Sequence, residues 1–379
     1  MNALDELVTD EAAREREFPV VAHKTYLAHA AVCPLPACVA RALREYVAAI
    51  ERDGQFEHLH AAAEASARRR AASLIGARAE EIAFAASTSA GLSMIAAGLP
   101  WQRGDSVVIA EADFPSNVYP WQQLARRGVE LRAIPAAISG IGLDDVSARV
   151  DASTRLVALS SVHFTTGARS DVDAIGAYVR GRGVLFCVDA IQSLGAVPTS
   201  CAHVDFMVAD AHKWLLGPQG IAVLYVRSEH FERLAPVLVG WKSAATSKDF
   251  SAAPQLTLAE GARRYEPGSL NALGVTGLAA ALELIERVGV DAIAARLARL
   301  RQQLTAAITT RGYELSGASD SGIVSFLRAG DDMRALQLRL DRKGVIVSLR
   351  RDPLGRECVR VAPHFYNTEA ELARLIALL

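Results

Sequence analysis

Two apolar runs between residues 183 and 220 each end on an ionisable side chain. The first run, "GVLFCVDAIQSLG" (183–195), reaches Asp189, and the second, "VDFMVADAHKWLLGPQG" (204–220), reaches Lys213. Short apolar runs bounded by turn residues are typical of strands buried in a parallel sheet. In open α/β sheets, ligands bind beyond the carboxyl ends of the strands. The pattern therefore predicts that a carboxylate and an amine meet at one ligand-binding edge.

Apolar runs of this type alternate with helical patterns between about Ala83 and Val226. This alternation predicts an α/β fold with a mostly parallel sheet covered by helices. Only a short turn separates "KWLL" from the last run, so we expect one antiparallel pair there. The runs are "SVVIAE" (106–111), "VELRAIP" (129–135), "LVALSSV" (156–162), "VLFCVDA" (184–190), "DFMVAD" (205–210) and "IAVLYV" (221–226).

Beyond about Gly268, long helical patterns lead into three short apolar runs and a final helical pattern. This change predicts a second, smaller α+β domain. We expect an N-terminal segment (1–20), a large ligand-binding domain (21–265) and a small C-terminal domain (266–379). Residues 21–60 could pack with the small domain.

Composition narrows the class of protein. The chain has 379 residues and a net charge of −1, so it lacks the basic surface that nucleic-acid binding requires. No apolar stretch is long enough to cross a membrane, and five cysteines without a CxxC pair favour reduced thiols in the cytoplasm. We expect neither a nucleic-acid nor a membrane partner. The "HLH" at 58–60 is interpreted as a solvated helix face, so no metal site is predicted.

The surroundings of Lys213 and Asp189 favour a particular cofactor. Lys213 lies between His212 and Trp214, and such apolar surroundings lower a lysine pKa, as a Schiff-base amine requires. An aspartate at the same edge could pair with a protonated pyridine nitrogen. The alternatives are a surface lysine and a helix N-cap for Asp189. Taken together, the two residues indicate pyridoxal 5'-phosphate.

A phosphate-bearing cofactor also needs an anion site. In "FAASTSAGLSMIAAGL" (84–99), the hydroxyls of Ser87, Thr88 and Ser89 precede a helical pattern, and a helix N-terminus binds phosphate. The alternative is an ordinary helix cap. "GIGLDD" (140–145) lacks the third glycine of a dinucleotide fingerprint, and no Walker loop is present.

Segments along nearly the whole chain resemble the class V aminotransferase family of fold-type I pyridoxal-phosphate enzymes. That family includes the cysteine desulfurases, kynureninase and isopenicillin N epimerase-like proteins. The resemblance implies a homodimer whose large domain contains a mostly parallel seven-stranded sheet. The segments are "YLAHAAVCPLP" (26–36), "STSAGL" (87–92), "EADFPSNVYPW" (111–121), "VDAIQSLGAVP" (188–198), "DAHKWLLGPQG" (210–220), "RYEPGSLNALG" (264–274) and "VRVAPHFYNTEAEL" (359–372).

The resemblance implies a role for each matching residue at the cofactor. Lys213 would form the Schiff base and move the Cα proton, and Asp189 would pair with the pyridine nitrogen. Gln192 would donate to the phenolic oxygen, and Phe114 would stack on the ring. The phosphate would be held by Thr88, Ser89 and His212, with Asp210 close by.

Other matching residues imply the substrate contacts and the dimer. Arg360 would bind the substrate α-carboxylate, for which a bidentate guanidinium is suited, although a surface arginine is the alternative. His29 and His163 fall on the substrate side. Gly268 and Ser269 would reach the cofactor phosphate of a second subunit.

Departures from the family pattern bear on the reaction. Where desulfurases carry a nucleophilic cysteine on a loop before the arginine, this chain has "SLRRDPLGREC" (348–358). Cys358 lies inside an apolar strand pattern, so we interpret it as a buried structural thiol. Arg350 and Arg351 could meet a second anionic group of the substrate or lie in a solvated turn.

These observations predict an enzyme that acts on an amino acid through a Schiff base at Lys213 and a carbanion at Cα. An aminotransferase-like reaction is the first choice. The alternative is a C–S lyase acting by β-elimination, or a cysteine desulfurase-like enzyme. Epimerisation and kynureninase-like hydrolysis follow, and a pyridoxal-phosphate-binding regulator without catalysis is the candidate from another class.

Overall fold

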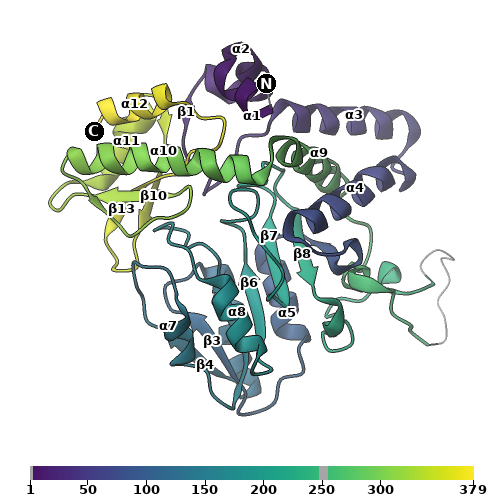
Figure 1. Cartoon of the computed structure of the whole chain (residues 1–379). Coiled ribbons are helices and arrows are strands. Elements are labelled where there is room, and N and C mark those ends of the chain that lie inside the picture. Colours follow the sequence, from purple (N-terminus) through teal and green to yellow (C-terminus); the bar gives the residue numbers. More distant parts are fainter. Residues whose placement is uncertain (1–2, 247–254) are drawn as a thin grey trace.

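The computed structural model describes residues 3–246 and 255–379. Its centre is a seven-stranded sheet with the order β2-β8-β7-β6-β5-β3-β4 (Figure 1). Neighbours from β7 to β4 run parallel, whereas β8 pairs antiparallel with both β7 and β2. The predicted mostly parallel α/β fold is therefore confirmed. The strands are β2 (Ile82–Ala85), β3 (Ser106–Ala110), β4 (Glu130–Ile134), β5 (Thr154–Ser160), β6 (Leu185–Asp189), β7 (Phe206–Asp210) and β8 (Ala222–Val226).

Helices cover both faces of this sheet, which explains the unbroken apolar runs. Alternate strand residues face opposite sides, so that Phe186 packs with the helices of one face and Cys187 with those of the other. One face is covered by α4 (His58–Ile75), α8 (Val172–Arg180) and α9 (Ala272–Val288), and the other by α5 (Thr88–Gly98) and α6 (Tyr119–Gln122). The short α7 (Leu143–Ser147) precedes β5.

A second, four-stranded antiparallel sheet with the order β12-β13-β10-β9 lies in the C-terminal part of the chain. Figure 1 shows the long α10 beside it, with α11 and α12 nearby. These elements are β9 (Glu314–Leu315), β10 (Val324–Leu327), β12 (Ser348–Arg351), β13 (Glu357–Val361), α10 (Val290–Thr310), α11 (Met333–Arg342) and α12 (Glu369–Ala377).

Residues 25–27 join this C-terminal region. β1 (Thr25–Tyr26) pairs in parallel with β11 (Val345–Ile346), and Leu27 is buried in the core of the small sheet. By contrast, α3 (Ala37–Asp53) packs against α4 and α9. The boundaries at residues 20 and 265 stay predictions.

The helices before β1 lie close to the C-terminus of the chain. They are α1 (Ala3–Thr9) and α2 (Glu11–Glu17). The guanidinium of Arg14 in α2 lies 2.9 Å from a carboxylate oxygen of Glu371 in α12, and both side chains are nearly buried. Figure 1 shows both ends of the chain at the same end of the molecule.

Three sequence expectations outside the sheet can be compared with the structure. In the described ranges, no helix is long and apolar enough to cross a membrane. All five cysteines are free thiols, while the expected cytoplasmic location stays a prediction. The solvated face expected at 58–60 is wrong for His60: His58 is exposed, but His60 is buried because its ring packs edge-on against Tyr46 of α3.

Candidate active site

The carboxyl ends of β6 and β7 form one wall of a pocket of about 270 Å³. β6 ends on Asp189, β7 ends on Asp210, and Lys213 follows in the next turn. The predicted meeting of a carboxylate and an amine at one sheet edge is thus observed. Sequence-predicted residues that line this pocket are Thr88, Ser89, Phe114, Asp189, Gln192, Asp210, His212, Lys213 and Arg360.

The turn that carries Lys213 is fixed from both sides. Its backbone closes through a hydrogen bond from the Gly217 N–H to the Ala211 carbonyl, 2.8 Å long. A Cβ on Gly217 would lie 2.8 Å from that of Ala211, so the turn needs glycine there. Leu216 has a φ of 59°, a left-handed conformation that costs about 1–3 kcal/mol and is found at functional sites. The turn therefore holds the lysine in a defined place.

Burial shapes the chemistry of Lys213, whose side chain is almost enclosed. Burial, followed by the charge of Arg360, lowers the pKa of Lys213 to about 8, although Asp189 opposes this shift. A substantial fraction of the amine is therefore neutral near physiological pH. Neutral amines are the nucleophiles that attack an aldehyde.

Asp189 has one carboxylate oxygen without a partner. Its Oδ1 accepts from the Ile191 N–H at 3.0 Å, but the buried Oδ2 has no hydrogen-bond partner in the described part of the chain. Burial, and then the neighbouring charge of Asp113, raises the pKa of Asp189 to about 7. A cationic N–H donor would both satisfy Oδ2 and restore the charge. The N-cap alternative is wrong, because only turns follow Asp189.

The start of α5 lies beside the pocket, where the anion site is expected. Ser87 caps the helix by accepting from the Ala90 N–H at 3.1 Å, and Thr88 and Ser89 of the first turn line the pocket. Ser89 shares a 2.6 Å hydrogen bond with Ser116 in an exposed position. Nδ1 of His212 lies 3.5 Å from an Asp210 oxygen and has no hydrogen bond among the described residues. Hydroxyls and backbone N–H groups of this kind bind phosphate.

Gln192 supports the floor of the pocket. Its Oε1 accepts from the Trp214 indole N–H at 2.8 Å, and its Nε2 donates to the Ala30 carbonyl at 3.0 Å. Trp214 is fully buried directly after the lysine. The amide has one further N–H that could reach a pocket oxygen.

Aromatic side chains form the opposite wall. The Phe114 ring is 41% exposed, and its centroid lies 5.6 Å from Nζ of Lys213. Phe164 meets it edge-on, with 5.3 Å between the ring centroids. A flat heteroaromatic ring bound above the lysine could stack on Phe114.

Arg360 is buried without a carboxylate partner among the described residues. Nη1 donates to the Phe164 carbonyl, while Nε and Nη2 have no acceptor there. Burial, together with the charge of Arg350, lowers the pKa of Arg360 to about 9. A buried cation of this kind is costly unless an anion binds to it.

Arg350 and Arg351, which the sequence placed either at the substrate or in a solvated turn, have different surroundings in the structure. Arg350 lines the pocket with Arg360, and its side chain is half-buried. Arg351 is exposed and lies 3.2 Å from a Glu357 oxygen. Of these two arginines, Arg350 is therefore the one placed to contribute to binding in this pocket.

The two predicted substrate-side histidines do not line this pocket. His29 is buried, with Nδ1 2.9 Å from the Ala362 carbonyl and Nε2 2.7 Å from the Tyr366 hydroxyl. His163 places Nε2 2.9 Å from the Ala112 carbonyl. Both rings are held by protein groups in this arrangement, and their contact with substrate stays a prediction.

Ser269 and Gly268 line a different cavity, of about 680 Å³. It lies beside β2 and α5, away from Lys213, and it shares none of its lining residues with the cofactor pocket. In the described single chain, these two residues therefore do not reach their own pocket.

Asp113 is a site residue that the sequence analysis missed. It is buried and accepts from the Phe114 N–H at 2.7 Å and from the Ser160 hydroxyl at 2.6 Å, so it fixes the backbone that carries the aromatic wall. Its charge also contributes to the raised pKa of Asp189. The sequence signal for Asp113 is its position directly before Phe114 in "EADFPSNVYPW" (111–121).

These features fit pyridoxal 5'-phosphate. The orphaned Oδ2 of Asp189 matches a pyridinium N–H, Phe114 a ring face, the start of α5 a phosphate and Lys213 an aldehyde. The fold and the site thus define a pyridoxal-phosphate-dependent enzyme of fold type I.

Comparison with known proteins identifies the family. The model of the aminotransferase class-V family matches residues 25–375, and the chain belongs to this family. A "Probable cysteine desulfurase" of Methanothermobacter thermautotrophicus is 30% identical over 384 residues, covering 95% of each chain. A "Cysteine desulfurase" of Klebsiella pneumoniae is 31% identical over 393 residues, with the same coverage.

A solved structure gives the same result. The cysteine desulfurase of Thermococcus onnurineus, in its apo form, superimposes with a TM-score of 0.89 at 27% identity, covering 97% of this chain and 96% of that one. The expected family, fold type and cofactor are thereby confirmed.

Proposed function

We propose that this enzyme breaks the C–S bond of a cysteine-type amino acid by β-elimination. The observation that carries this proposal is a pocket that combines a buried amine with a buried arginine that pairs with no carboxylate of the described residues. No thiol is among the residues that line this pocket. Relatives named as cysteine desulfurases support sulfur chemistry over the transamination that the sequence analysis put first.

The cysteines argue for elimination rather than transfer of sulfur to an enzyme thiol. Cys358 is completely buried in β13, and burial raises its pKa, so its thiol is a poor nucleophile. The other cysteines also lie outside the pocket lining; they are Cys33, Cys38, Cys187 and Cys201. Sulfur would therefore leave the pocket as part of a released product and would not be transferred to an enzyme thiol.

Different residues of the pocket would contact different parts of the substrate. Arg360 would bind the α-carboxylate through Nε and Nη2, which face no acceptor in the described chain. Arg350 would attract an anionic group on the sulfur side. Phe114 and Phe164 would restrict water access to the reacting carbons.

Lys213 would then transfer the proton of the substrate Cα. Pyridoxal phosphate, when bound, supplies an electron sink for the carbanion at Cα. The Lys213 amine takes the Cα proton, and the C–S bond breaks as sulfur departs with the bonding electron pair. The protonated Lys213 can return the proton to the sulfur. The released aminoacrylate hydrolyses to pyruvate and ammonia, so that L-cysteine and water give pyruvate, ammonia and sulfide.

Product analysis tests this proposal. The purified protein is loaded with pyridoxal phosphate and given L-cysteine or L-cystine. Elimination predicts pyruvate and ammonia in equal amounts with reduced or persulfide sulfur. Alanine as the carbon product would instead indicate desulfurase chemistry, and conversion of an added 2-oxo acid into an amino acid would indicate transamination.

Two variants make the test sharper. Cys358→Ala should keep its pyruvate yield, because no enzyme thiol takes part. Lys213→Ala should lose about 10²–10⁴-fold in rate, the usual contribution of a positioned general base, or more. Retained activity in Lys213→Ala would overturn the proposed mechanism.

We also propose that Ser269 and Gly268 act across a homodimer. They line the 680 Å³ cavity beside an exposed apolar segment, in which Val237, Leu238 and Val239 are each about half exposed or more. Exposed apolar patches of this kind mark protein interfaces. If a second subunit packs on this apolar segment, the phosphate of the cofactor bound to that subunit could approach Ser269.

Subunit mixing tests the shared site. Lys213→Ala and Ser269→Asp, each inactive alone, are unfolded together and refolded as hybrids. If Ser269 serves the partner's site, one site of each hybrid carries neither defect and activity returns. If Ser269 serves its own site, mixing restores nothing, and a monomer by light scattering would also refute the proposal.

A further inference from the structure

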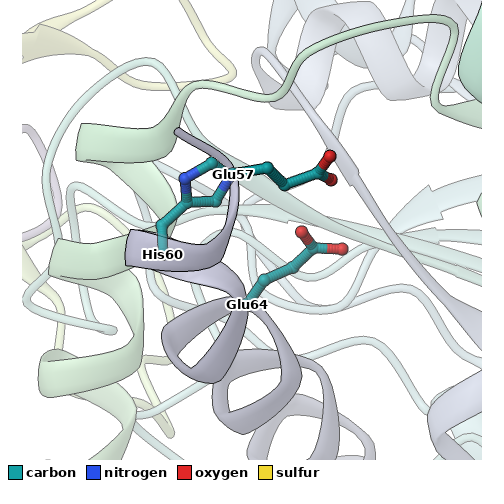
Figure 2. Close-up of side chains that lie close together, drawn as sticks. All are labelled: Glu57, His60 and Glu64. Atoms are coloured by element: carbon teal, nitrogen blue, oxygen red, sulfur yellow. The ribbon is translucent and has the colours of Figure 1, made fainter. Parts of the chain in front are cut away.

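Glu57, His60 and Glu64 gather at the beginning of α4, and none of them lines the cofactor pocket. Their spacing of three and four residues places them on one face of the helix. One ligand-type atom from each, an imidazole nitrogen or a carboxylate oxygen, lies within 4.8 Å of the others. Figure 2 shows the three side chains projecting together from the first turns of α4.

His60 is the observation that points to a ligand. Its side chain is 7% exposed, and both Nδ1 and Nε2 are buried without a hydrogen-bond partner in the described ranges. An unsatisfied buried nitrogen costs about 1–3 kcal/mol. A bond from one ring nitrogen to a metal ion would remove part of this cost.

The two carboxylates already have cationic partners that leave room for an ion. Glu64 uses Oε1 to accept from Arg68 at 2.8 Å, and its Oε2 has no hydrogen bond within the described chain. Glu57 forms an ion pair with the Lys242 ammonium, and its side chain is half exposed. An incoming hydrated cation could therefore enter at Glu57 and replace Lys242.

The donor atoms suit metal binding, because carboxylates and imidazoles are common ligands of divalent cations. One imidazole with two carboxylates is a donor set for Zn²⁺ or a similar divalent transition metal, with water completing the coordination.

A second group of similar residues serves as a comparison. In the cluster of Asp205, Glu229 and His230, the His230 Nε2 lies 2.7 Å from an Asp205 oxygen. Arg180 and Arg227 both lie within 4 Å of that aspartate. This cluster is a satisfied ion-pair network, whereas the imidazole of His60 has no hydrogen bond to any residue that the structure describes.

We propose that Glu57, His60 and Glu64 bind one divalent transition-metal ion, with the Lys242 ammonium displaced from Glu57. Lys242 lies in a short 3-10 turn (Trp241–Ser243) whose backbone N–H at Lys242 bonds to the Pro267 carbonyl, directly before Gly268. The ion would thus bind beside the segment that we assign to the subunit interface.

Calorimetric titration of the metal-stripped holoenzyme with Zn²⁺ tests this proposal, with Co²⁺ absorption reporting the ligand set. We expect one saturable site per chain. Loss of a residue that hydrogen-bonds to a metal ligand weakens metal binding by roughly 10–100-fold. His60→Gln and Glu57→Gln each remove a direct ligand, so each should weaken Zn²⁺ binding by more than this. Glu57 is half exposed, so Glu57→Gln should fold even if His60→Gln does not.

Two further variants serve as controls. One should tighten metal binding, and the other should leave it unchanged. Lys242→Met removes the internal competitor and should tighten binding about two- to fivefold, the scale of a partly exposed ion pair. His58→Gln, on the same helix but exposed, should change nothing. Absence of saturable binding, or equal affinity in Glu57→Gln and wild type, would overturn the proposal.

Discussion

Thr88 and Asp210 hold each other by two reciprocal hydrogen bonds. The Thr88 N–H donates to Oδ2 of Asp210 at 2.8 Å, and the Asp210 N–H donates to the Thr88 hydroxyl oxygen at 3.0 Å. These bonds join the end of β7 to the first residue of α5. The same pair therefore sets the distance between the anion site and the turn that carries Lys213.

We predict that Thr88→Val destabilises the protein by about 1–3 kcal/mol, because it leaves the buried Asp210 N–H without an acceptor. Thr88→Ser keeps the hydroxyl and should cost much less. Urea unfolding of both variants without cofactor measures the difference. Equal stabilities would show that the reciprocal bond contributes nothing.

Asp189 should make the cofactor-free protein less stable as the pH rises. Its pKa of about 7 lies above the ordinary value of 3.8, so the folded protein holds a proton between these values that the unfolded chain has lost. The contribution of Asp189 to the free energy of unfolding is fully present below about pH 4. It is lost as the pH rises through 7, at no more than about 1.4 kcal/mol per pH unit.

Unfolding curves at pH 5 and pH 7 check this expectation. Asp189→Asn cannot titrate, so its stability relative to wild type should increase between these two pH values. In the cofactor-loaded protein, a ring N–H keeps Asp189 ionised and the slope should vanish. The same slope in variant and wild type would contradict the assignment.

Lys213 should react with aldehydes at a lower pH than an ordinary lysine. Because its pKa is about 8, the neutral amine accumulates as the pH rises through 8 rather than 10.5. Borohydride trapping of pyridoxal on the cofactor-free protein, followed by peptide mass spectrometry, gives the midpoint. Arg360→Met should raise this midpoint, since the arginine lowers the pKa of the lysine, whereas Arg351→Met should leave it in place.

Arg360→Lys should lower kcat/KM by about 10–100-fold, because one ammonium cannot replace the two donors of a charge-assisted, bidentate contact. Arg351→Lys is the matched control and should retain the wild-type value, since Arg351 faces away from the pocket and pairs with Glu357. Steady-state rates with L-cysteine provide the comparison. Similar losses in both variants would argue against carboxylate binding by Arg360.

The sequence was informative where a single physical rule determines the outcome. All six runs became strands. Five of them are apolar because both sheet faces are covered, whereas β4 lies at the edge of the sheet with Glu130 and Ala133 exposed. The antiparallel partner of β7 proved to be β8, and "KWLL" became the lysine turn instead of a strand. The positive φ of Leu216 and the closure by Gly217 depend on local geometry that apolar patterning does not encode.

Side-chain partners were harder to predict than strands. Asp189 and Lys213 meet because parallel strands end at one edge, a relationship that sequence order implies. The bonds of His29 to Ala362 and Tyr366, by contrast, join positions from the two ends of the chain. His60 shows the same limit, because an "HLH" pattern does not tell which histidine faces the Tyr46 ring.

The pairing of β1 with β11 has a consequence for the order of folding. Thr25 is synthesised long before its partner Val345, because all strands of the large sheet lie between them in the sequence. Contacts between such distant positions form slowly, because the whole intervening loop must be closed first. The strands of the large sheet all precede β9 in the sequence, so this sheet can assemble before the strands of the small sheet are synthesised. The cofactor edge can therefore form before Arg360 of β13 is available.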